Sequence, residues 1–256
     1  MKGEISLKMV MNKAQLLGSQ TAKGGFKNEQ DVADKFSNWK TDDEAQKWLV
    51  LMDYNLHEIE LIEAVVICGH KADVNVQIRI KLRKAADIEN IQVKLVSNPK
   101  GFNQIDKRPI DTYNSTLSWN MSANVINILK RFTGELPPTI PNPRDNRRMF
   151  IDEFSASEQK EVFDFLNANK AMIMNDVFRG RGKFAAEWII VAQKTNQNAR
   201  WVLKNINEVI NHYAGEVGIS PRGSIKIGNI LIQRKGGTPD PTSLQFKINP
   251  AELFDI

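Results

Sequence analysis

The sequence predicts an α/β fold in which a mixed β-sheet is flanked by helices, followed by a second mixed α/β region. Three observations predict this fold class: strict apolar–polar alternation over residues 73–83, apolar positions at helical spacing before it, and a proline-rich connector at 134–148. The chain has 256 residues, of which 41% are hydrophobic and 25% are charged. This is an ordinary globular composition, and the chain is long enough to bury a core.

The first half of the chain predicts two helices and then strands. Residues 30–40 and 44–52 are predicted as helices, the first because four apolar residues recur at helical spacing: Val32, Ala33, Phe36 and Trp39. Residues 63–69 are predicted as a buried strand. In 73–83, Val74, Val76, Ile78, Ile80 and Leu82 alternate with polar residues, as in a half-buried strand. Residues 91–97 alternate in the same way after a short turn, so the two runs predict an antiparallel hairpin.

The second half begins after a connector. Four of the ten prolines fall within seven residues of 134–148, a stretch that cannot continue a helix or a central strand. We therefore expect two domains, 1–135 and 136–256. Ser155 and Glu158 form a capping-box pattern that predicts a helix over 155–170. Further strands are predicted for 171–178, 185–194, 219–237 and 243–248.

Several classes of protein are excluded by composition. A single cysteine, Cys68, leaves no internal disulfide framework, and three histidines far apart make a zinc site unexpected. No apolar run approaches the length of a membrane span, and the N-terminus has no apolar core of a secretory signal. We expect a cytoplasmic protein.

Positive charge is concentrated in one part of the chain. The net charge is +5, but residues 179–235 contain ten Lys or Arg against three Asp or Glu. Such clustering is typical of a nucleic-acid binder, because lysine and arginine neutralise phosphates. A merely solvated basic face is the alternative.

One residue pattern within the predicted hairpin indicates chemistry. Gln92 and Lys94 are two apart on a strand, so their side chains leave the same face, and pairing would bring Asp73 beside them. A carboxylate, an amide oxygen and a lysine make a plausible magnesium site for phosphodiester hydrolysis. Asp73 would hold the metal, Gln92 would add a ligand, and Lys94 would orient the attacking water and offset charge on the phosphorus. An outward-facing Gln/Lys pair on a surface strand is the alternative.

A neutral amide holds a cation less well than a carboxylate, so another acid is expected to compensate. Glu29 and Asp31 on the preceding predicted helix are the candidates. For Asp31 the better interpretation is an acid in the first turn that the helix dipole favours.

The chain resembles the type II restriction endonucleases that recognise GCGC and cut after the first G, within the PD-(D/E)xK nuclease superfamily. That family has an Asp, eighteen intervening residues and Gln-x-Lys, matched here by Asp73, Gln92 and Lys94. The resemblance runs through nearly the whole chain, including residues 18–29, 91–107, 132–138, 147–150, 179–194, 199–209, 220–225, 232–237 and 244–256. Ala72 replaces a small hydroxyl residue of the family, and Gln92 replaces the acid of the wider superfamily.

This resemblance implies a Mg²⁺-dependent enzyme that cleaves double-stranded DNA and leaves 5′-phosphates, with a catalytic N-terminal half and a DNA-reading C-terminal half. Phe102 and Gln104 would wedge at the base steps, with Lys107 contacting a base or a phosphate. An ordinary loop with Phe102 in the core is the alternative. Arginine can read guanine through O6 and N7, and a GCGC site offers two guanines per strand. The remaining expected DNA contacts, in the basic C-terminal half, are Arg179, Arg181, Arg222, Gln233, Arg234 and Lys235.

The expected partners follow from the same resemblance. A cognate DNA methyltransferase is expected in the same restriction–modification system, although not as a bound partner, and the enzyme is expected to be a monomer or a weak dimer. Two other functions stay open at this point: a DNA-binding protein without catalysis, and a repair-type nuclease with little sequence choice.

Overall fold

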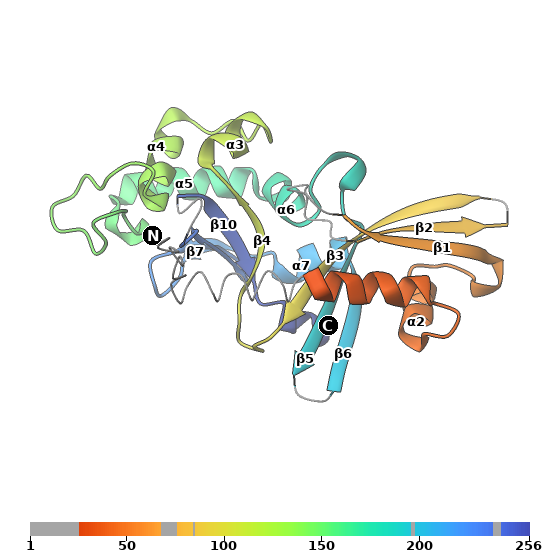
Figure 1. The fold of residues 1–256 in the computed structure, drawn as a ribbon. Coiled ribbons are helices and arrows are strands. Elements are labelled where there is room, and N and C mark those ends of the chain that lie inside the picture. Colours follow the sequence, from red (N-terminus) through yellow and green to blue (C-terminus); the bar gives the residue numbers. More distant parts are fainter. Residues whose placement is uncertain (1–25, 68–75, 84, 196–197, 238–241) are drawn as a thin grey trace, which may run out of the picture.

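The described part of the chain forms two five-stranded sheets (Figure 1). The structure is a computed structural model that describes residues 26–67, 76–83, 85–195, 198–237 and 242–256. The first sheet has the order β1-β2-β3-β5-β6 and the second the order β4-β10-β9-β8-β7. Both are accompanied by helices, so the predicted α/β class with a mixed sheet is confirmed.

The first sheet is mixed because one of its strand pairs is parallel. Its strands are β1 (Ile59–Val66), β2 (Val76–Leu82), β3 (Ala86–Val96), β5 (Trp188–Thr195) and β6 (Asn198–Asn205). The pair β3–β5 is parallel, and the other neighbours are antiparallel. Thus β3 lies at the centre of the sheet, between the β1–β2 hairpin and the β5–β6 hairpin.

One face of this sheet is covered by the first two helices. Residues 26–37 are helical, and α2 (Asp43–Leu51) follows after Asp42, whose side chain accepts hydrogen bonds from the first turn. The predicted stripe is buried as expected, since Val32 and Phe36 are 0% exposed and pack in one cluster with Ile78, Ile91 and Ile190. The helices over 30–40 and 44–52 are therefore confirmed, with slightly different ends.

The predicted hairpin is confirmed, whereas the preceding strand differs from expectation. Strands β2 and β3 are antiparallel, with Val76 opposite Ile91. The strand predicted as buried at 63–69 runs instead over Ile59–Val66 and alternates between burial and exposure, with Val65 52% exposed. The physical reason is its position at the edge of the sheet, where helices cover only one face.

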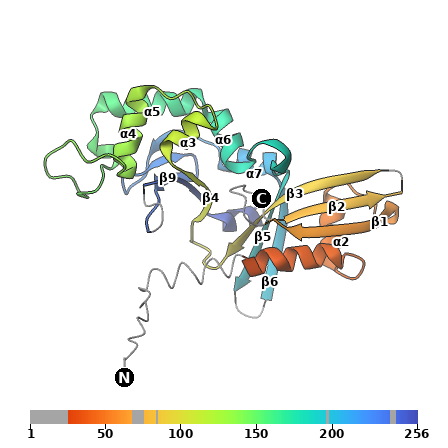
Figure 2. The same ribbon diagram turned by 45° about the horizontal axis from the view of Figure 1, so that its top comes forward.

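The second sheet is antiparallel throughout and packs one face on helices (Figure 2). Its strands are β4 (Asn103–Arg108), β7 (Val217–Ile219), β8 (Ile225–Ile227), β9 (Ile230–Arg234) and β10 (Leu244–Ile248). The helices are α3 (Ile110–Ser115), α4 (Ala123–Thr133), α5 (Ala156–Ala168), α6 (Lys170–Phe178) and α7 (Ile206–Tyr213). Contacts of α4 with β9, α5 with β7 and α6 with β4 enclose the larger core. Short 3₁₀ turns cover Leu56–Glu58, Ile151–Glu153, Gly182–Phe184 and Pro250–Phe254.

Most predicted elements of the second half are confirmed, and one is wrong. The capping box of Ser155 and Glu158 begins α5, β8, β9 and β10 lie within the predicted strand segments, and β5 overlaps its predicted segment and ends one residue later, at Thr195. Residues 171–178, predicted as a strand, form helix α6 instead. Its buried positions 173, 174, 177 and 178 have the spacing of one helical face, which a run of only eight residues did not separate from a buried strand.

The connector joins α4 to α5 and contains little regular structure. It begins at Gly134, whose positive φ of 82° ends α4, and a Cβ there would lie 2.5 Å from the carbonyl oxygen of Arg147. Each sheet takes strands from both sides of residue 135, since β5 and β6 enter the first sheet and β4 enters the second. The division of the chain into two domains stays a prediction. Within the described residues, no helix has the length and apolar character needed to cross a membrane.

Candidate active site and DNA-binding surface

Gln92 and Lys94 leave the same face of the central strand β3. Nε2 of Gln92 donates a hydrogen bond to the carbonyl oxygen of Phe178 at the end of α6. Nζ of Lys94 donates to the carbonyl oxygen of Gln104 on β4, at 3.3 Å. The neighbours Ile91 and Val93 point the other way, into the cluster under the first two helices. The expected shared face is therefore present, and it is turned toward the second sheet and α6.

The amide of Gln92 has one atom without a hydrogen-bond partner among the described residues. The side chain is 0% exposed, and the bond to the Phe178 carbonyl fixes which end of the amide is the donor. The other end, Oε1, is buried and accepts no hydrogen bond from any described residue. A buried acceptor left unsatisfied costs about 1–3 kcal/mol. A cation at Oε1 would remove this cost, so the residue fits a metal ligand.

Asp73, the expected principal ligand, lies outside the described residues. Strand β2 begins at Val76, three positions along the chain, and Val76 pairs with Ile91, the neighbour of Gln92. Among the residues that the structure does describe, no group of three or more His, Cys, Asp or Glu side chains could hold a metal ion.

The two acids considered as compensating ligands lie in the helix over 26–37. This helix packs through Val32 and Phe36 on the face of the sheet opposite to Gln92. Asp31 forms an ion pair with Lys194 near the end of β5. Glu29 is half-buried in the same helix. The described residues thus bring Gln92 and Lys94 together but do not place Glu29 on their face.

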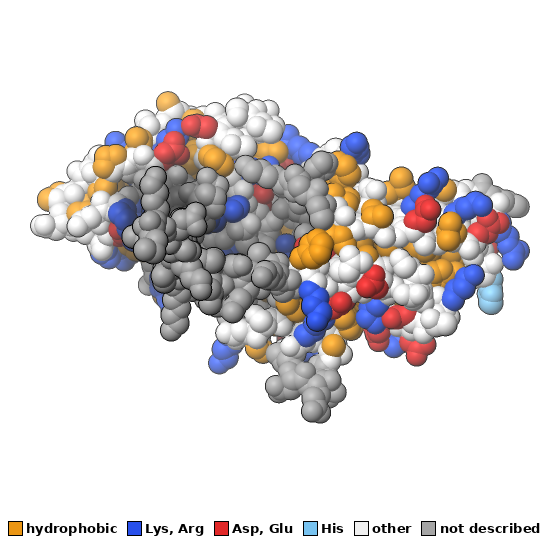
Figure 3. All heavy atoms as spheres, viewed as in Figure 1, with side chains coloured by type: hydrophobic (Ala, Val, Ile, Leu, Met, Phe, Trp, Pro, Cys, Tyr) orange, Lys and Arg blue, Asp and Glu red, His pale blue; other side chains and the backbone are white. Residues whose placement is uncertain are grey.

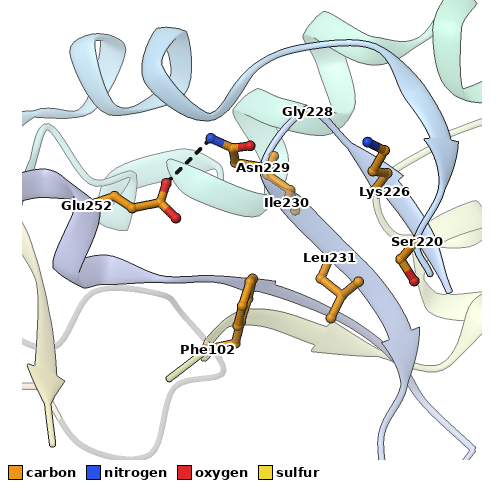
Figure 4. A pocket seen from close by; sticks show the side chains of 8 residues that line it. All are labelled: Phe102, Ser220, Lys226, Gly228, Asn229, Ile230, Leu231 and Glu252. Carbon is orange, nitrogen blue, oxygen red and sulfur yellow. Dashed lines mark hydrogen bonds between the residues drawn. The ribbon is translucent and has the colours of Figure 1, made fainter. Parts of the chain in front are cut away.

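Phe102 is at the surface rather than in the core. It precedes β4, is 46% exposed and lines an open pocket together with Lys226 and Leu231 (Figure 4). The remaining lining residues are Ser220, Gly228, Asn229, Ile230 and Glu252, and Asn229 donates to Glu252. Gln104, predicted in the same loop, instead belongs to strand β4 and pairs with Lys247. An accessible aromatic ring is what a wedge into stacked bases requires.

The second sheet has one apolar face and one polar face. Leu244, Phe246 and Ile248 of β10 are buried in the core, so Gln245 and Lys247 project from the opposite side. Their paired neighbours on adjacent strands share that side. We call this set the polar face of the second sheet: Gln104, Lys107, Lys226, Leu231, Gln233, Gln245 and Lys247. It contains three lysines and three glutamines and no acid.

Hydrogen bonds join the three glutamines of this face across three strands. Gln233 on β9 donates to Oε1 of Gln245 on β10 at 3.5 Å. Nε2 of Gln245 in turn donates to Oε1 of Gln104 on β4 at 2.7 Å. Burial lowers the pKa of Lys247 beside them. Sequence reasoning did not find Gln245 or Lys247, although the alternation within residues 244–248 was the signal that could have placed them on one face.

Two of the predicted DNA-contacting arginines are held by acids of the protein. The guanidinium group of Arg181 donates two hydrogen bonds to the buried Asp176, from Nε to Oδ1 at 2.6 Å and from Nη2 to Oδ2 at 2.7 Å. Nη2 also donates to the carbonyl oxygen of Leu117 at 2.9 Å. Arg179, at the end of α6, pairs with Glu187. These guanidinium groups therefore stabilise the segment between α6 and β5.

The other predicted contacts lie at the ends of strands in the second sheet. Arg222 is exposed in the turn between β7 and β8. Arg234 ends β9, where burial first and the positive charge of Arg147 second lower its pKa. Lys235 follows it, with its backbone N–H bonded to the carbonyl oxygen of Ser243. Arg147 and Arg148 of the connector lie near Arg234 and were not predicted as part of this site.

A central strand that carries a buried amide oxygen and a lysine, next to a sheet with a basic polar face, is an arrangement compatible with a DNA-cleaving enzyme. The model of the R.HinP1I restriction endonuclease family matches residues 52–254, and the chain belongs to this family. It is thus a restriction endonuclease, a site-specific deoxyribonuclease.

The fold comparison agrees with this assignment. The chain is similar to the crystal structure of the restriction endonuclease MspI in complex with its cognate DNA, with a TM-score of 0.64 and 13% sequence identity over 93% of each chain. A search of curated proteins gave no match.

Proposed function

We propose that this protein is a cytoplasmic type II restriction endonuclease that hydrolyses double-stranded DNA at GCGC, requires Mg²⁺ and leaves 5′-phosphates. The observation that carries the proposal is the shared face of Gln92 and Lys94 on the central strand of a chain of this family. The buried, unpartnered Oε1 of Gln92 supports a cation at that face.

We propose that Asp73 and Gln92 hold the metal ion. Glu29 stays a predicted additional ligand only, because its helix packs on the opposite face of the sheet. Oxygen ligands of this kind suit Mg²⁺, which keeps several of its own waters. When bound, the ion would activate water toward the scissile phosphorus and neutralise negative charge on it. The chain's own contribution at Gln92 is orientation, because the Phe178 carbonyl holds Nε2 and leaves Oε1 for the cation.

Lys94 is the proposed electrostatic and proton-handling group. Its ammonium group is held at the junction of the two sheets by the carbonyl oxygen of Gln104. From there a fixed positive charge offsets the negative charge that develops on the attacked phosphate, and it orients the attacking water. Because this hydrogen bond already positions Lys94, no free energy is spent on reorienting it during the reaction.

The polar face of the second sheet is the proposed reading surface. Gln104, Lys107 and Gln233 lie on it, and Phe102 stands at its edge as the proposed wedge. Arg222, Arg234 and Lys235 would extend it at the strand ends. We propose that Arg179 and Arg181 contact DNA phosphates with their remaining N–H groups while they stay paired with Glu187 and Asp176.

Digestion of a mapped plasmid tests the proposal. With Mg²⁺ the purified protein should give discrete fragments whose ends lie at GCGC, and with EDTA the plasmid should stay intact. A plasmid treated beforehand with a methyltransferase that modifies GCGC should resist cleavage, as expected for a restriction–modification pair. Sedimentation during the same preparation should show a monomer or a weak dimer.

Asp73→Ala is the matched control for catalysis. It should abolish cleavage while specific binding to a GCGC duplex is kept, because the aspartate is proposed to hold the metal rather than the bases. Retained cleavage would refute the assignment of Asp73. An intact plasmid in all conditions, together with tight site-specific binding, would instead identify a DNA-binding protein without catalysis.

A further inference from the structure

Gln245 is a buried glutamine at the centre of the polar face of the second sheet. Only 8% of it is exposed, and it lies on β10 between Gln233 of β9 and Lys107 of β4. A buried amide must satisfy both its donor and its acceptor. Gln245 does so entirely with two other side-chain amides of the same face.

The hydrogen bonds of these three amides have one direction. Gln233 donates to Oε1 of Gln245, and Nε2 of Gln245 donates to Oε1 of Gln104. Because Oε1 of Gln104 accepts this bond, its NH₂ group is turned away from Gln245. Gln104 is exposed, and no described residue accepts a hydrogen bond from its Nε2. The outermost group of this series of three amides, the NH₂ group of Gln104, is therefore a hydrogen-bond donor.

We propose that Gln245 is a positioning residue for base recognition: it fixes the amide of Gln104 so that donor hydrogens are presented to the DNA. This inference rests on the proposed function. In the major groove guanine offers two acceptors, O6 and N7, whereas cytosine, the other base of a GCGC site, offers an exocyclic donor. A glutamine locked with its NH₂ group outward therefore favours guanine, and Gln245 selects this orientation without touching the DNA.

Gln245→Glu should reverse the presented group. A glutamate keeps an acceptor for Gln233 but has no hydrogen to give Gln104, and its carboxylate repels the carbonyl oxygen of that residue. The amide of Gln104 should then turn over, donate to the new carboxylate and present its oxygen outward. Gln245→Leu removes both hydrogen bonds and should leave the orientation of Gln104 unselected.

The test compares kcat/KM on synthetic duplexes that contain GCGC, with each guanine replaced in turn by 7-deazaguanine, which lacks the N7 acceptor. The unmodified protein should lose about tenfold at the guanine that Gln104 reads. Three variants should cleave the unmodified duplex and the duplex with 7-deazaguanine at that position at nearly equal rates: Gln104→Leu, Gln245→Glu and Gln245→Leu. Gln159→Leu is the control, since Gln159 lies on α5, away from this face, and donates to the carbonyl oxygen of Phe154 just before that helix.

The outcomes separate this inference from the proposed function. If the unmodified protein does not prefer GCGC duplexes over unrelated ones, the proposed function fails. If it does, and both Gln245 variants keep the full 7-deazaguanine effect, the positioning role is refuted. Loss of activity of both variants on every duplex would also refute it, because selection between bases would then not be what Gln245 provides. Using ratios of rates removes any uniform effect of the added charge or of lowered stability.

Discussion

At the scale of single residues, Gln92 shows how a neutral side chain occupies a position where the wider superfamily has an acid. Its amide is held at one end by the Phe178 carbonyl and is left unpartnered among the described residues at the other. A carboxylate would bring charge to the metal but could not donate to that carbonyl. Compared with a carboxylate, the amide would attract the proposed cation less strongly, but it donates a hydrogen bond to the carbonyl oxygen of Phe178.

This arrangement predicts different effects for two substitutions of Gln92. Gln92→Leu should abolish cleavage, since no oxygen remains at the position. Gln92→Glu should keep measurable cleavage and lower the Mg²⁺ concentration for half-maximal rate, because a carboxylate binds the cation more strongly. Metal titrations of the cleavage rate measure both. Indifference of the rate and of the titration to either change would show that residue 92 is not a ligand.

At the scale of elements, the segment between α6 and β5 is held by two ion pairs, of which that of Arg181 with Asp176 is the more buried. Asp176 is 2% exposed and accepts hydrogen bonds from Arg181 and from Nε1 of Trp119, at 2.8 Å. Arg181→Met should lower the free energy of unfolding by about 2–4 kcal/mol, because it leaves a buried carboxylate without its cation. Urea unfolding measures this. Arg222→Met, at an exposed turn, is the matched control and should change stability by less than about 0.5 kcal/mol. Equal stability of the two variants would contradict the role given to Arg181.

The connector predicts a dependence of stability on pH. Hydrogen bonds from the Arg147 side chain, and then from its backbone N–H, lower the pKa of Asp145 to about 2. A carboxyl group whose pKa is lower in the folded state stabilises the fold above its unfolded pKa of about 4, and this contribution is lost as the pH falls toward the folded value.

The substitution Asp145→Asn isolates this contribution. The difference in unfolding free energy between the natural protein and the variant should be constant near neutral pH and shrink between about pH 4 and pH 2. Urea unfolding at pH 7, 4 and 3 measures the difference. A difference that stays the same at all three values would show that the ionised carboxylate of Asp145 does not stabilise the connector.

Local patterns in the sequence predicted the alternating strands β2 and β3 and did not predict β4 as a strand. The β2–β3 hairpin and the shared face of Gln92 and Lys94 follow from a period of two, which each strand carries within itself. Strand β4 does not alternate cleanly, because an irregularity in its pairing with β10 lies beside Ile105, and the buried Asp106 is satisfied by Tyr113 and Arg108. The sequence therefore predicts a loop over 101–104, where the structure begins β4 at Asn103.

The assembly of the polar face could not be predicted for a different reason. Gln104 and Gln245 are 141 positions apart and meet only because β4 pairs with β10. Periodicity tells which side of a strand a residue occupies, but it does not tell which strand lies beside it. The arginine-based prediction likewise lacked the acids Asp176 and Glu187, whose proximity is a property of the folded chain.

At the scale of the whole molecule, charge is distributed unevenly between the two sheets. Figure 3 shows acidic and basic side chains intermingled over α2 and the β1–β2 end, where Lys47 pairs with Glu44 and Lys81 with Glu60. The polar face of the second sheet instead combines lysines and glutamines without an acid. DNA is expected to approach the second sheet.

This distribution predicts how salt affects DNA binding. Each phosphate neutralised by the protein contributes about −0.9 to the slope of log K against log salt concentration. Lys226→Ala should make the slope less steep by about 1 and weaken binding to all sequences alike. Lys47→Ala on α2 should leave the slope unchanged. Binding titrations at several salt concentrations measure both slopes, and equal slopes for the two variants would place the DNA elsewhere.

Because the chain alternates between its two sheets, neither sheet is encoded by one continuous part of the gene. The chain gives β3 to the first sheet, β4 to the second, β5 and β6 to the first and β7 to β10 to the second. A recombination event near the connector that exchanged the C-terminal half between two relatives would import β5 and β6 of the first sheet and leave β4 of the second sheet behind. The proposed reading surface is therefore not exchanged as one continuous segment of the chain. New specificities should arise by point substitutions on the polar face, while the whole chain is passed on as one unit.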